Sequence, residues 1–361
     1  MKRPGWILLL LLLACPAWGA RKITVVQLQD LLQSLKQADK TDAEVGAELE
    51  QVELTEELTK SAMDSLASFV PGPLTSNQIY VLEARNALLA PPAADLPSTP
   101  APDAAGQKAL LDKAIDYATK TYAQLPHVTA TKTTFRFQDH VPPADDQVFH
   151  YIGSIDAQVE IRGGAEVPTT VKDTTKWGAN NQIAIVGQGP VLTTALQEAQ
   201  AVGKINWLRW ETLYGRQTAV FSFAVDKKKS HYAVNYCCFP NADQGSMNLV
   251  NAGLQPGTAG NMQDGMTWTP YKATVPYHGE LFVDSETGTV TRLITVADFR
   301  PFDTVHQEDT RIDYSTVNVG GKSLILPVRT IIDTEDFPTG SPVGKRIVRR
   351  TLFTSEIKDY K

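Results

Sequence analysis

Histidine is the residue type that most often holds a metal or transfers a proton, and this sequence has six of them. They are scattered, and none stands at the spacing of a metal-binding motif: His127, His140, His150, His231, His278 and His306. The chain also has no serine-nucleophile motif, no Walker phosphate loop and no dinucleotide fingerprint. These patterns predict a protein that is not an enzyme and uses no cofactor and no metal.

Two groups of carboxylates are candidates for acid–base or calcium chemistry. Asp284 and Glu286 stand in a polar turn, where an aspartate bonds its own backbone, and the turn offers fewer oxygens than the about six to eight that calcium takes. Asp309, Arg311 and Asp313 alternate along one strand face. That alternation favours cross-strand ion pairs over a catalytic acid–base pair.

Cys237 and Cys238 are neighbours in the segment NYCCFPN. Their Cα atoms lie about 3.8 Å apart, which is shorter than a relaxed disulfide prefers, and adjacent side chains on a strand point to opposite faces. Two packed thiols are therefore the favoured interpretation. A vicinal disulfide and a redox or metal role are the alternatives.

The N-terminus has the three regions of a secretory signal peptide, predicted over residues 1–20. Lys2 and Arg3 precede an apolar run and then small residues. The run is too short to span a bilayer, and no later segment is apolar enough, so we expect no integral membrane segment after signal removal. The protein is expected to be exported, periplasmic or extracellular. In the alternative, Cys15 follows a lipobox-like sequence and carries a lipid anchor.

Composition bounds the class of protein. The 361 residues are 42% apolar and 8% aromatic, which is typical of a globular chain long enough for two domains. The formal charge is −6, and it becomes −8 if Lys2 and Arg3 leave with the signal. This acidic balance argues against nucleic acid as a partner, because nucleic-acid binders carry a basic surface.

Residues 21–89 are predicted to form a segment of short helices. Three capping boxes mark helix starts: Thr24 with Gln27, Thr41 with Glu44, and Thr75 with Gln78. Acidic residues follow the opposite faces, at Glu48, Glu50, Glu53, Glu56 and Glu57. Such a face is usually solvated, and its functional alternative is contact with a protein partner.

Residues 90–106 contain five prolines and are predicted to be an extended linker. Residues 107–361 then form the main domain, which opens with a helix over 107–125 and continues in runs of period two. Hairpin turns join these runs, which indicates an antiparallel sheet. The predicted fold class is α+β, with a long curved, half-barrel-like antiparallel sheet packed on helices and preceded by the helical segment.

Apolar side chains on this sheet are the candidate ligand contacts. In the run over 149–161, alternate residues share one face, and aromatic residues gather over 207–223. A packed core is the favoured interpretation of the aromatic group, and the lining of a groove is the alternative. The predicted contacts are Phe149, Tyr151, Ile155, Val159, Ile161, Trp207 and Trp210.

Five blocks carry a family resemblance. They are VELTEELT (52–59), LPHVTATKTTFRFQD (125–139), WLRWETLYGRQTAVFSFAV (207–225), HGELFVDSETGTVTRL (278–293) and IDYSTVNVGGKSLILPVRT (312–330). Their order resembles a family of uncharacterised secreted proteins abundant in acidobacteria, over nearly the whole mature chain. This resemblance implies no activity and no catalytic residue.

The C-terminal strands and the final GGK–LP–R hairpin are more distantly similar to periplasmic lipoprotein carriers of the LolA type. In those carriers an incomplete barrel wraps helices and holds acyl chains, so the resemblance implies a cavity for a lipid or a lipidated protein. The helical segment and the linker depart from that pattern, and a shared fold does not fix function.

Three functions follow as hypotheses. The first is an exported, non-enzymatic envelope protein that binds an apolar ligand or lipidated partner in its half-barrel. The alternative is a structural or protein-interaction module with a filled sheet, which contacts its partner through the N-terminal helices. The third is a hydrolase whose site is assembled from scattered residues.

Overall fold

The computed structural model describes residues 20–139, 147–167, 184–185, 189–240, 268–300, 303–336 and 348–361. Almost all of the predicted signal peptide, including Cys15, lies outside these residues. His140 and the side chains of Cys237 and Cys238 lie outside them as well. Within the described residues, no helix combines the length and the apolar character that crossing a membrane requires.

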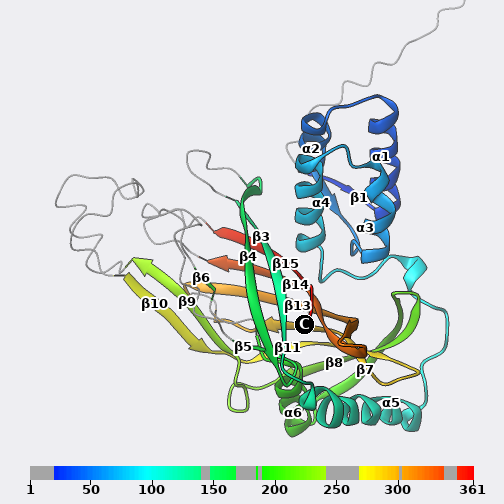
Figure 1. Ribbon diagram of the computed structural model, residues 1–361, viewed down its shortest axis with the longest axis vertical. Helices are drawn as coiled ribbons and strands as arrows, with labels where there is room; N and C mark the ends of the chain where they lie inside the picture. Colours follow the sequence, from blue (N-terminus) through cyan, green and yellow to red (C-terminus); the bar gives the residue numbers. More distant parts are fainter. Residues whose placement is uncertain are drawn as a thin grey trace, which may run out of the picture.

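The N-terminal segment is a small helical unit with its own core (Figure 1). Its elements are β1 (Arg21–Ile23), α1 (Val25–Gln37), α2 (Asp42–Glu50), β2 (Val52–Leu54), α3 (Lys60–Leu66), the short turn η1 (Ala67–Phe69) and α4 (Pro73–Arg85). The strands β1 and β2 pair in parallel. Leu28, Leu32 and Leu49 are fully buried in this core, each on the apolar stripe of its helix.

Two of the three predicted capping boxes are confirmed. The side chains of Thr24 and Thr41 cap α1 and α2, and each box is closed by the glutamine or glutamate three residues later. The third prediction is wrong, because α4 already begins at Pro73 and Thr75 lies inside it. There the carboxylate of Asp42 accepts the amides of Leu74 and Thr75, both at 2.9 Å, so α2 supplies the cap for α4.

The chain then enters the main domain through helical elements and long strands. The helical elements are η2 (Ala93–Asp95), α5 (Ala104–Asp116), the π-helical turn η3 (Tyr117–Thr121), η4 (Tyr122–Gln124) and α6 (Leu192–Val202). The strands are β3 (Val128–Gln138), β4 (His150–Arg162), β5 (Ala165–Val167), β6 (Ala184–Ile185), β7 (Ile205–Leu213), β8 (Arg216–Val225), β9 (Ala233–Pro240), β10 (Trp268–Thr274), β11 (Tyr277–Asp284), β12 (Val290–Ala297), β13 (Val305–Val319), β14 (Lys322–Asp336) and β15 (Arg349–Lys358).

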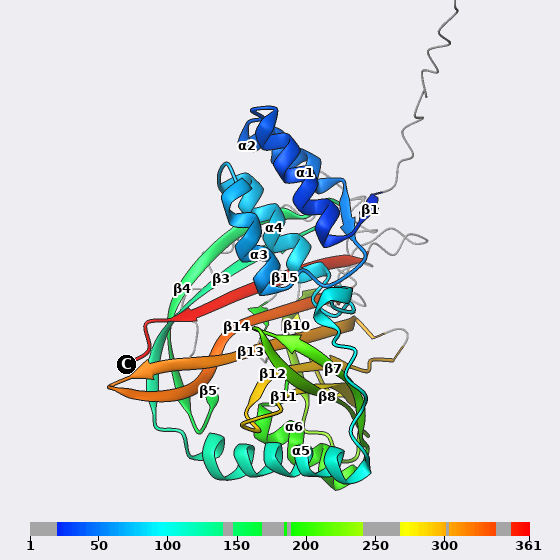
Figure 2. The same ribbon diagram turned by 90° about the vertical axis from the view of Figure 1, so that its right-hand side faces the viewer.

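Ten of these strands form one antiparallel sheet in the order β5-β4-β3-β15-β14-β13-β12-β11-β8-β7. The sheet is curved and is not closed into a barrel (Figure 2). A second sheet has the order β10-β9-β6. The α+β class and the curved antiparallel sheet predicted from the sequence are therefore confirmed.

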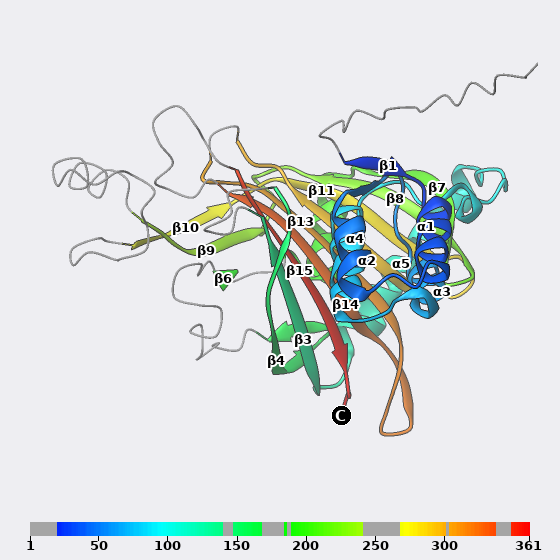
Figure 3. The same cartoon turned by 90° about the horizontal axis from the view of Figure 1, so that it is seen from above.

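The two faces of the large sheet carry different layers. We call the face that packs against α5 and α6 the inner face, and its core includes Tyr122, Leu196, Phe221 and Tyr277. The other, outer face packs against α4 through Val81, Ala84, Phe137, Ile331 and Leu352. Figures 1 and 2 show the two groups of helices on opposite sides of the sheet, and Figure 3 shows α4 over its middle strands.

The predicted linker also belongs to the folded structure. It contains the turn η2, and the indole nitrogen of Trp210 on β7 donates a hydrogen bond of 3.0 Å to the carbonyl of Pro100. The path from α4 to α5 is therefore held against the edge strand of the sheet.

Gly279 gives a test of the sheet register. A Cβ atom at this position would overlap the backbone carbonyl oxygen of Ile294 on the paired strand. We expect Gly279→Ala to lower the free energy of unfolding by about 3 kcal/mol, because neither backbone can move without breaking the ladder. The measurement is urea unfolding followed by circular dichroism.

The matched control is Gly46→Ala in α2, where the nearest atom would lie 3.5 Å away, in ordinary contact. This change should be neutral or stabilise by about 0.5–1 kcal/mol, since alanine favours a helix over glycine. Equal losses in the two variants would contradict the register described above.

Candidate functional site

Charged side chains form a row across the outer face of the sheet. The strand register places Arg292 opposite Asp313, Asp313 opposite Arg329, and Arg329 opposite Glu356. Because side chains on directly paired residues share a face, these four groups follow one another on neighbouring strands with alternating sign. The cross-strand ion pairing predicted for Asp313 is confirmed by its 2.5 Å bond from Arg292 Nε.

Glu57 from the helical segment enters this row between two arginines. Its Oε1 accepts hydrogen bonds of 3.0 Å from Arg292 and 2.7 Å from Arg311, and Arg311 also binds Asp313 at 2.9 Å. All four side chains are at most 3% exposed. The ring of Phe282 lies 5.2 Å from the guanidinium of Arg292 and adds a cation–π contact.

Glu83 of α4 makes a second contact of the same kind. It binds Arg329, which also donates to Glu356 at 3.1 Å and lies over the ring of Tyr80. Two carboxylates of the helical segment thus bind arginines of the sheet. The prediction that Glu57 belongs to a solvated acidic face is wrong, because residue 57 follows β2 in a non-helical stretch and is buried against the sheet.

Burial and pairing act in opposite directions on the carboxyl pKa values here. Burial tends to raise the pKa of Asp313, but Arg292 and Arg311 outweigh it and hold that pKa well below its ordinary range. At Glu83 burial wins over Arg329 and raises the pKa. Asp313 is therefore a permanent anion of the interior, and the arrangement is a set of buried ion pairs.

A polar group also interrupts the apolar inner face. Glu308 accepts a 2.6 Å hydrogen bond from the hydroxyl of Tyr236, and burial raises the pKa of Glu308 to about 7. Its other oxygen, the Tyr232 hydroxyl and the Thr310 hydroxyl are buried and have no partner among the described residues. Orphaned polar atoms of this kind are the usual seat of a buried water.

Histidines lie at carboxylates in separate places. Among the described residues, the pairs with ion-pair geometry are His127 with Glu160, His231 with Glu198, His278 with Asp298 and His306 with Glu335. His231 is exposed, and Glu198 holds its ring and also accepts the Tyr277 hydroxyl at 2.7 Å. Across the described ranges, no three histidine, cysteine or acidic side chains gather in a way that could hold a metal.

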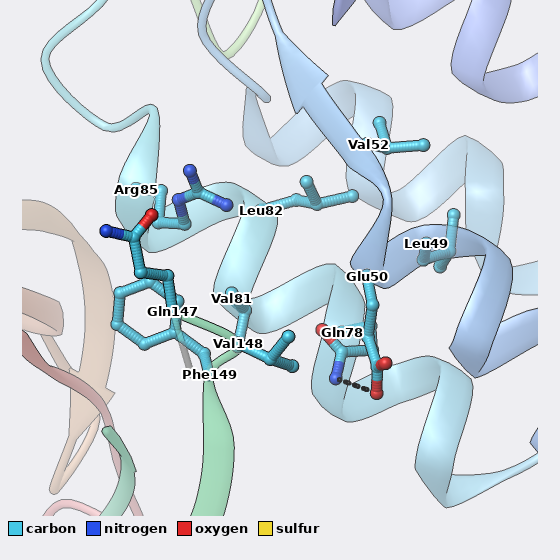
Figure 4. A pocket seen from close by; sticks show the side chains of 10 residues that line it. All are labelled: Leu49, Glu50, Val52, Gln78, Val81, Leu82, Arg85, Gln147, Val148 and Phe149. Carbon is cyan, nitrogen blue, oxygen red and sulfur yellow. Dashed lines mark hydrogen bonds between the residues drawn. The ribbon is translucent and has the colours of Figure 1, made fainter. Parts of the chain in front are cut away.

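Two cavities border α4 on the outer side of the sheet. The smaller, of about 20 Å³, lies between α2, α4 and the residues just before β4 and is lined by Leu49, Gln78 and Phe149 among others (Figure 4). The larger, of about 110 Å³, lies between the end of α4 and the strands β13, β14 and β15. Arg85 lines both.

The predicted apolar contacts occupy several different places. Phe149 packs under α4 on the outer face, and Tyr151 is 45% exposed with its ring against Phe137. A β-bulge lies between Tyr151 and Gly153 and changes which side chains of β4 point to which face of the sheet. Ile155 and every second residue after it therefore point to the inner face. This bulge is invisible in the alternation of residue types that suggested one common face.

The remaining predicted contacts are packed within the domain. Val159 lies with Ala130 and Ile357, and Ile161 lies with Val128 and Leu326. The rings of Trp207 and Trp210 are 4.8 Å apart and border the core under α5 and α6. The structure brings this tryptophan pair together but does not join it with the β4 residues into one lining.

The carboxylate of Asp284 bonds the backbone of its own turn, as the sequence predicted. Its Oδ1 accepts the backbone amides of Glu286 and Thr287, at 3.1 and 2.8 Å. The carboxylate is therefore engaged in turn geometry and in an ion pair with Arg216.

Comparison of the chain with protein-family models, curated proteins and solved structures gave no match.

Replacement of Glu57 tests the ion-pair site. Glu57→Gln keeps the shape but leaves Arg292 and Arg311 with one carboxylate, so we expect the free energy of unfolding to fall by about 3–5 kcal/mol. Urea unfolding measures this loss. The matched control is Glu53→Gln, whose half-exposed ion pair with Lys22 at 3.8 Å should contribute at most about 1 kcal/mol. Similar losses in both variants would contradict the buried role of Glu57.

Glu308 gives a prediction for pH. Its pKa is raised from 4.5 to about 7, so the folded protein keeps the carboxyl protonated where the unfolded chain ionises it. The contribution of Glu308 to stability therefore falls as the pH rises from about 4.5 to about 7 and is constant above that range. As the pH rises from 5 to 8, the free energy of unfolding of the wild type should fall by about 3 kcal/mol more than that of Glu308→Gln. Parallel pH profiles of the two proteins, measured by urea unfolding, would contradict the shift.

Proposed function

We propose that this protein is an exported, non-enzymatic protein of the cell envelope that acts as a protein-binding platform. The supporting observation is that the chain's own helices occupy the inner face of the sheet. The Tyr122 ring lies 5.6 Å from that of Tyr314, and its hydroxyl binds the Gly164 carbonyl. Leu192 and Leu196 of α6 are buried in the same core.

The outer face also carries the helical segment, which Glu57 and Glu83 bind to the sheet. The surface we assign to a partner is the exposed part of that segment. There Val26 is 66% exposed and Leu74 is 51% exposed, on helices whose polar positions include the exposed acids Asp30 and Glu48. An apolar side chain among acids suits a protein partner better than an anionic lipid surface.

The second candidate is the binding of an apolar ligand or a lipidated protein in the half-barrel. The observation in its favour is that Ile155 and Ala157 face inward on β4 and are only half-buried. Against it, both cavities described above lie on the outer side, and the larger one is lined by charges.

Site-specific photo-crosslinking tests the platform. A photo-reactive amino acid at Val26 should give one defined covalent complex with a protein partner in the producing cell envelope, while the same residue at Leu208 on β7, which is 43% exposed, should give none. Mass spectrometry identifies the product. Crosslinks that are equal at both positions, or absent at Val26, would contradict the proposal.

Native mass spectrometry of the full chain separates the two candidates. The platform predicts the mass of the bare protein. A lipid adduct that disappears in Ile155→Glu and persists in Tyr151→Glu would instead favour the apolar-ligand function, because the bulge places these two residues on opposite faces.

A further inference from the structure

The larger cavity lies where the last turn of α4 meets the outer face of the sheet. Its volume is about 110 Å³. Its lining is apolar at Ala84, Ala87, Leu88 and Ile331 and polar at Arg85, Gln307, Asp309, Arg311, Asp333 and Arg350. A cavity of about 150 Å³ holds a benzene molecule, so this space holds a group of roughly five heavy atoms.

Two of the three arginines in the cavity wall are neutralised. Arg311 binds Glu57 and Asp313. Arg350 binds Asp333 through Nε at 2.8 Å. The positive charges of Arg311 and Arg350 are therefore balanced by carboxylates of the protein itself.

Arg85 is different. Its guanidinium lies 5.5 Å from the centre of the Phe149 ring and makes no ion pair or hydrogen bond with any residue that the structure describes. Burial, followed by the charge of Arg350, lowers the pKa of Arg85, yet a guanidinium remains charged in proteins. A half-buried cation whose N–H donors have no partner and that lines a cavity is stabilised when an anion binds there.

Asp309 completes the polar wall. Its Oδ2 accepts a 2.8 Å hydrogen bond from Gln307, and it stands directly opposite Asp333 in the strand register. Burial, reinforced by the charge of Asp333, raises the pKa of Asp309 to about 7. Below that pH the carboxyl group is neutral and can donate a hydrogen bond.

We propose that this cavity binds a small anion carrying a carboxylate or phosphate group, with the Arg85 guanidinium as its counter-charge. The anion would contact α4 on one side and β13–β15 on the other. A bound anion would therefore stabilise the packing of the helical segment on the sheet. This site is independent of the protein-binding surface at Val26.

The affinity of the site depends on pH through the groups that face Asp309. These are Asp333 and Glu335 on β14, Arg350 on β15, Gln307 and Arg311 on its own strand, and Arg85 on α4. Glu335 is itself paired with His306 at 3.2 Å. As the pH rises through about 7, Asp309 loses its proton, so the anion loses a donor and meets a like charge. Anion affinity should therefore fall with rising pH.

Calorimetric titration of the full chain with acetate, and separately with phosphate, at constant ionic strength tests the proposal. At pH 6 the wild type should bind at least one of them saturably, and Arg85→Gln should weaken binding at least about tenfold. The matched control is Arg162→Gln on β4, an arginine whose side chain is 64% exposed, and it should bind like the wild type. Whichever of the two anions binds more tightly shows whether the site prefers a carboxylate or a phosphate group.

A second variant keeps the test independent of the folding of Arg85→Gln. The pH dependence is measured with a carboxylate probe, because acetate stays ionised between pH 6 and pH 8 whereas phosphate changes charge. Wild-type affinity for acetate should fall at least about fivefold over this interval, and Asp309→Asn should abolish the fall. Absence of saturable binding at pH 6 for both anions, or identical binding by Arg85→Gln and the wild type, would overturn the proposal.

Discussion

The contact of Glu57 with Arg292 and Arg311 is the interaction on which the arrangement of the whole molecule depends. Both guanidiniums are removed from water, and Asp313 supplies only one of the two negative charges that they need. Loss of Glu57 alone would leave a buried charge short of a partner, at a cost of several kcal/mol. The contact therefore ties the helical segment to one place on the sheet.

This constraint explains why the two faces of the sheet differ. The outer face meets the helical segment through alternating charges together with a small apolar cluster around Phe137 and Leu352. The inner face meets α5 and α6 through the large apolar core. Charged pairs require defined partners and geometry, whereas apolar contact is non-directional, so the outer layer fixes how the segment is oriented while the inner layer supplies most of the buried apolar area.

The sequence predicted the features that depend on neighbours in the chain. The caps at Thr24 and Thr41, the Asp284 turn and the period-two strands all follow from residues within a few positions of one another. It failed where a partner comes from far away. Thr75 resembles a cap but Asp42 provides it, Glu57 resembles a solvated acid but meets arginines more than 230 positions later, and one extra residue in β4 separates Tyr151 from Ile155. Only the alternation from Asp309 to Asp313 gave a signal for the site, because its ion pairs follow strand geometry.

Glu308 and Asp309 show how sheet geometry gives neighbouring residues separate chemistry. They are adjacent in β13, yet one faces the tyrosines of the inner core and the other faces the cavity under α4. Burial is the main cause that raises the pKa of each to about 7, but the secondary causes differ. The hydrogen bond from the Tyr236 hydroxyl opposes the shift at Glu308, whereas the charge of Asp333 adds to it at Asp309. An anion bound near Arg85 would act directly on Asp309, while Glu308 lies on the other face of the sheet with the Tyr236 hydroxyl as its donor. The outer carboxyl is therefore the one whose protonation can report on a ligand, and the inner one belongs to the stability of the core.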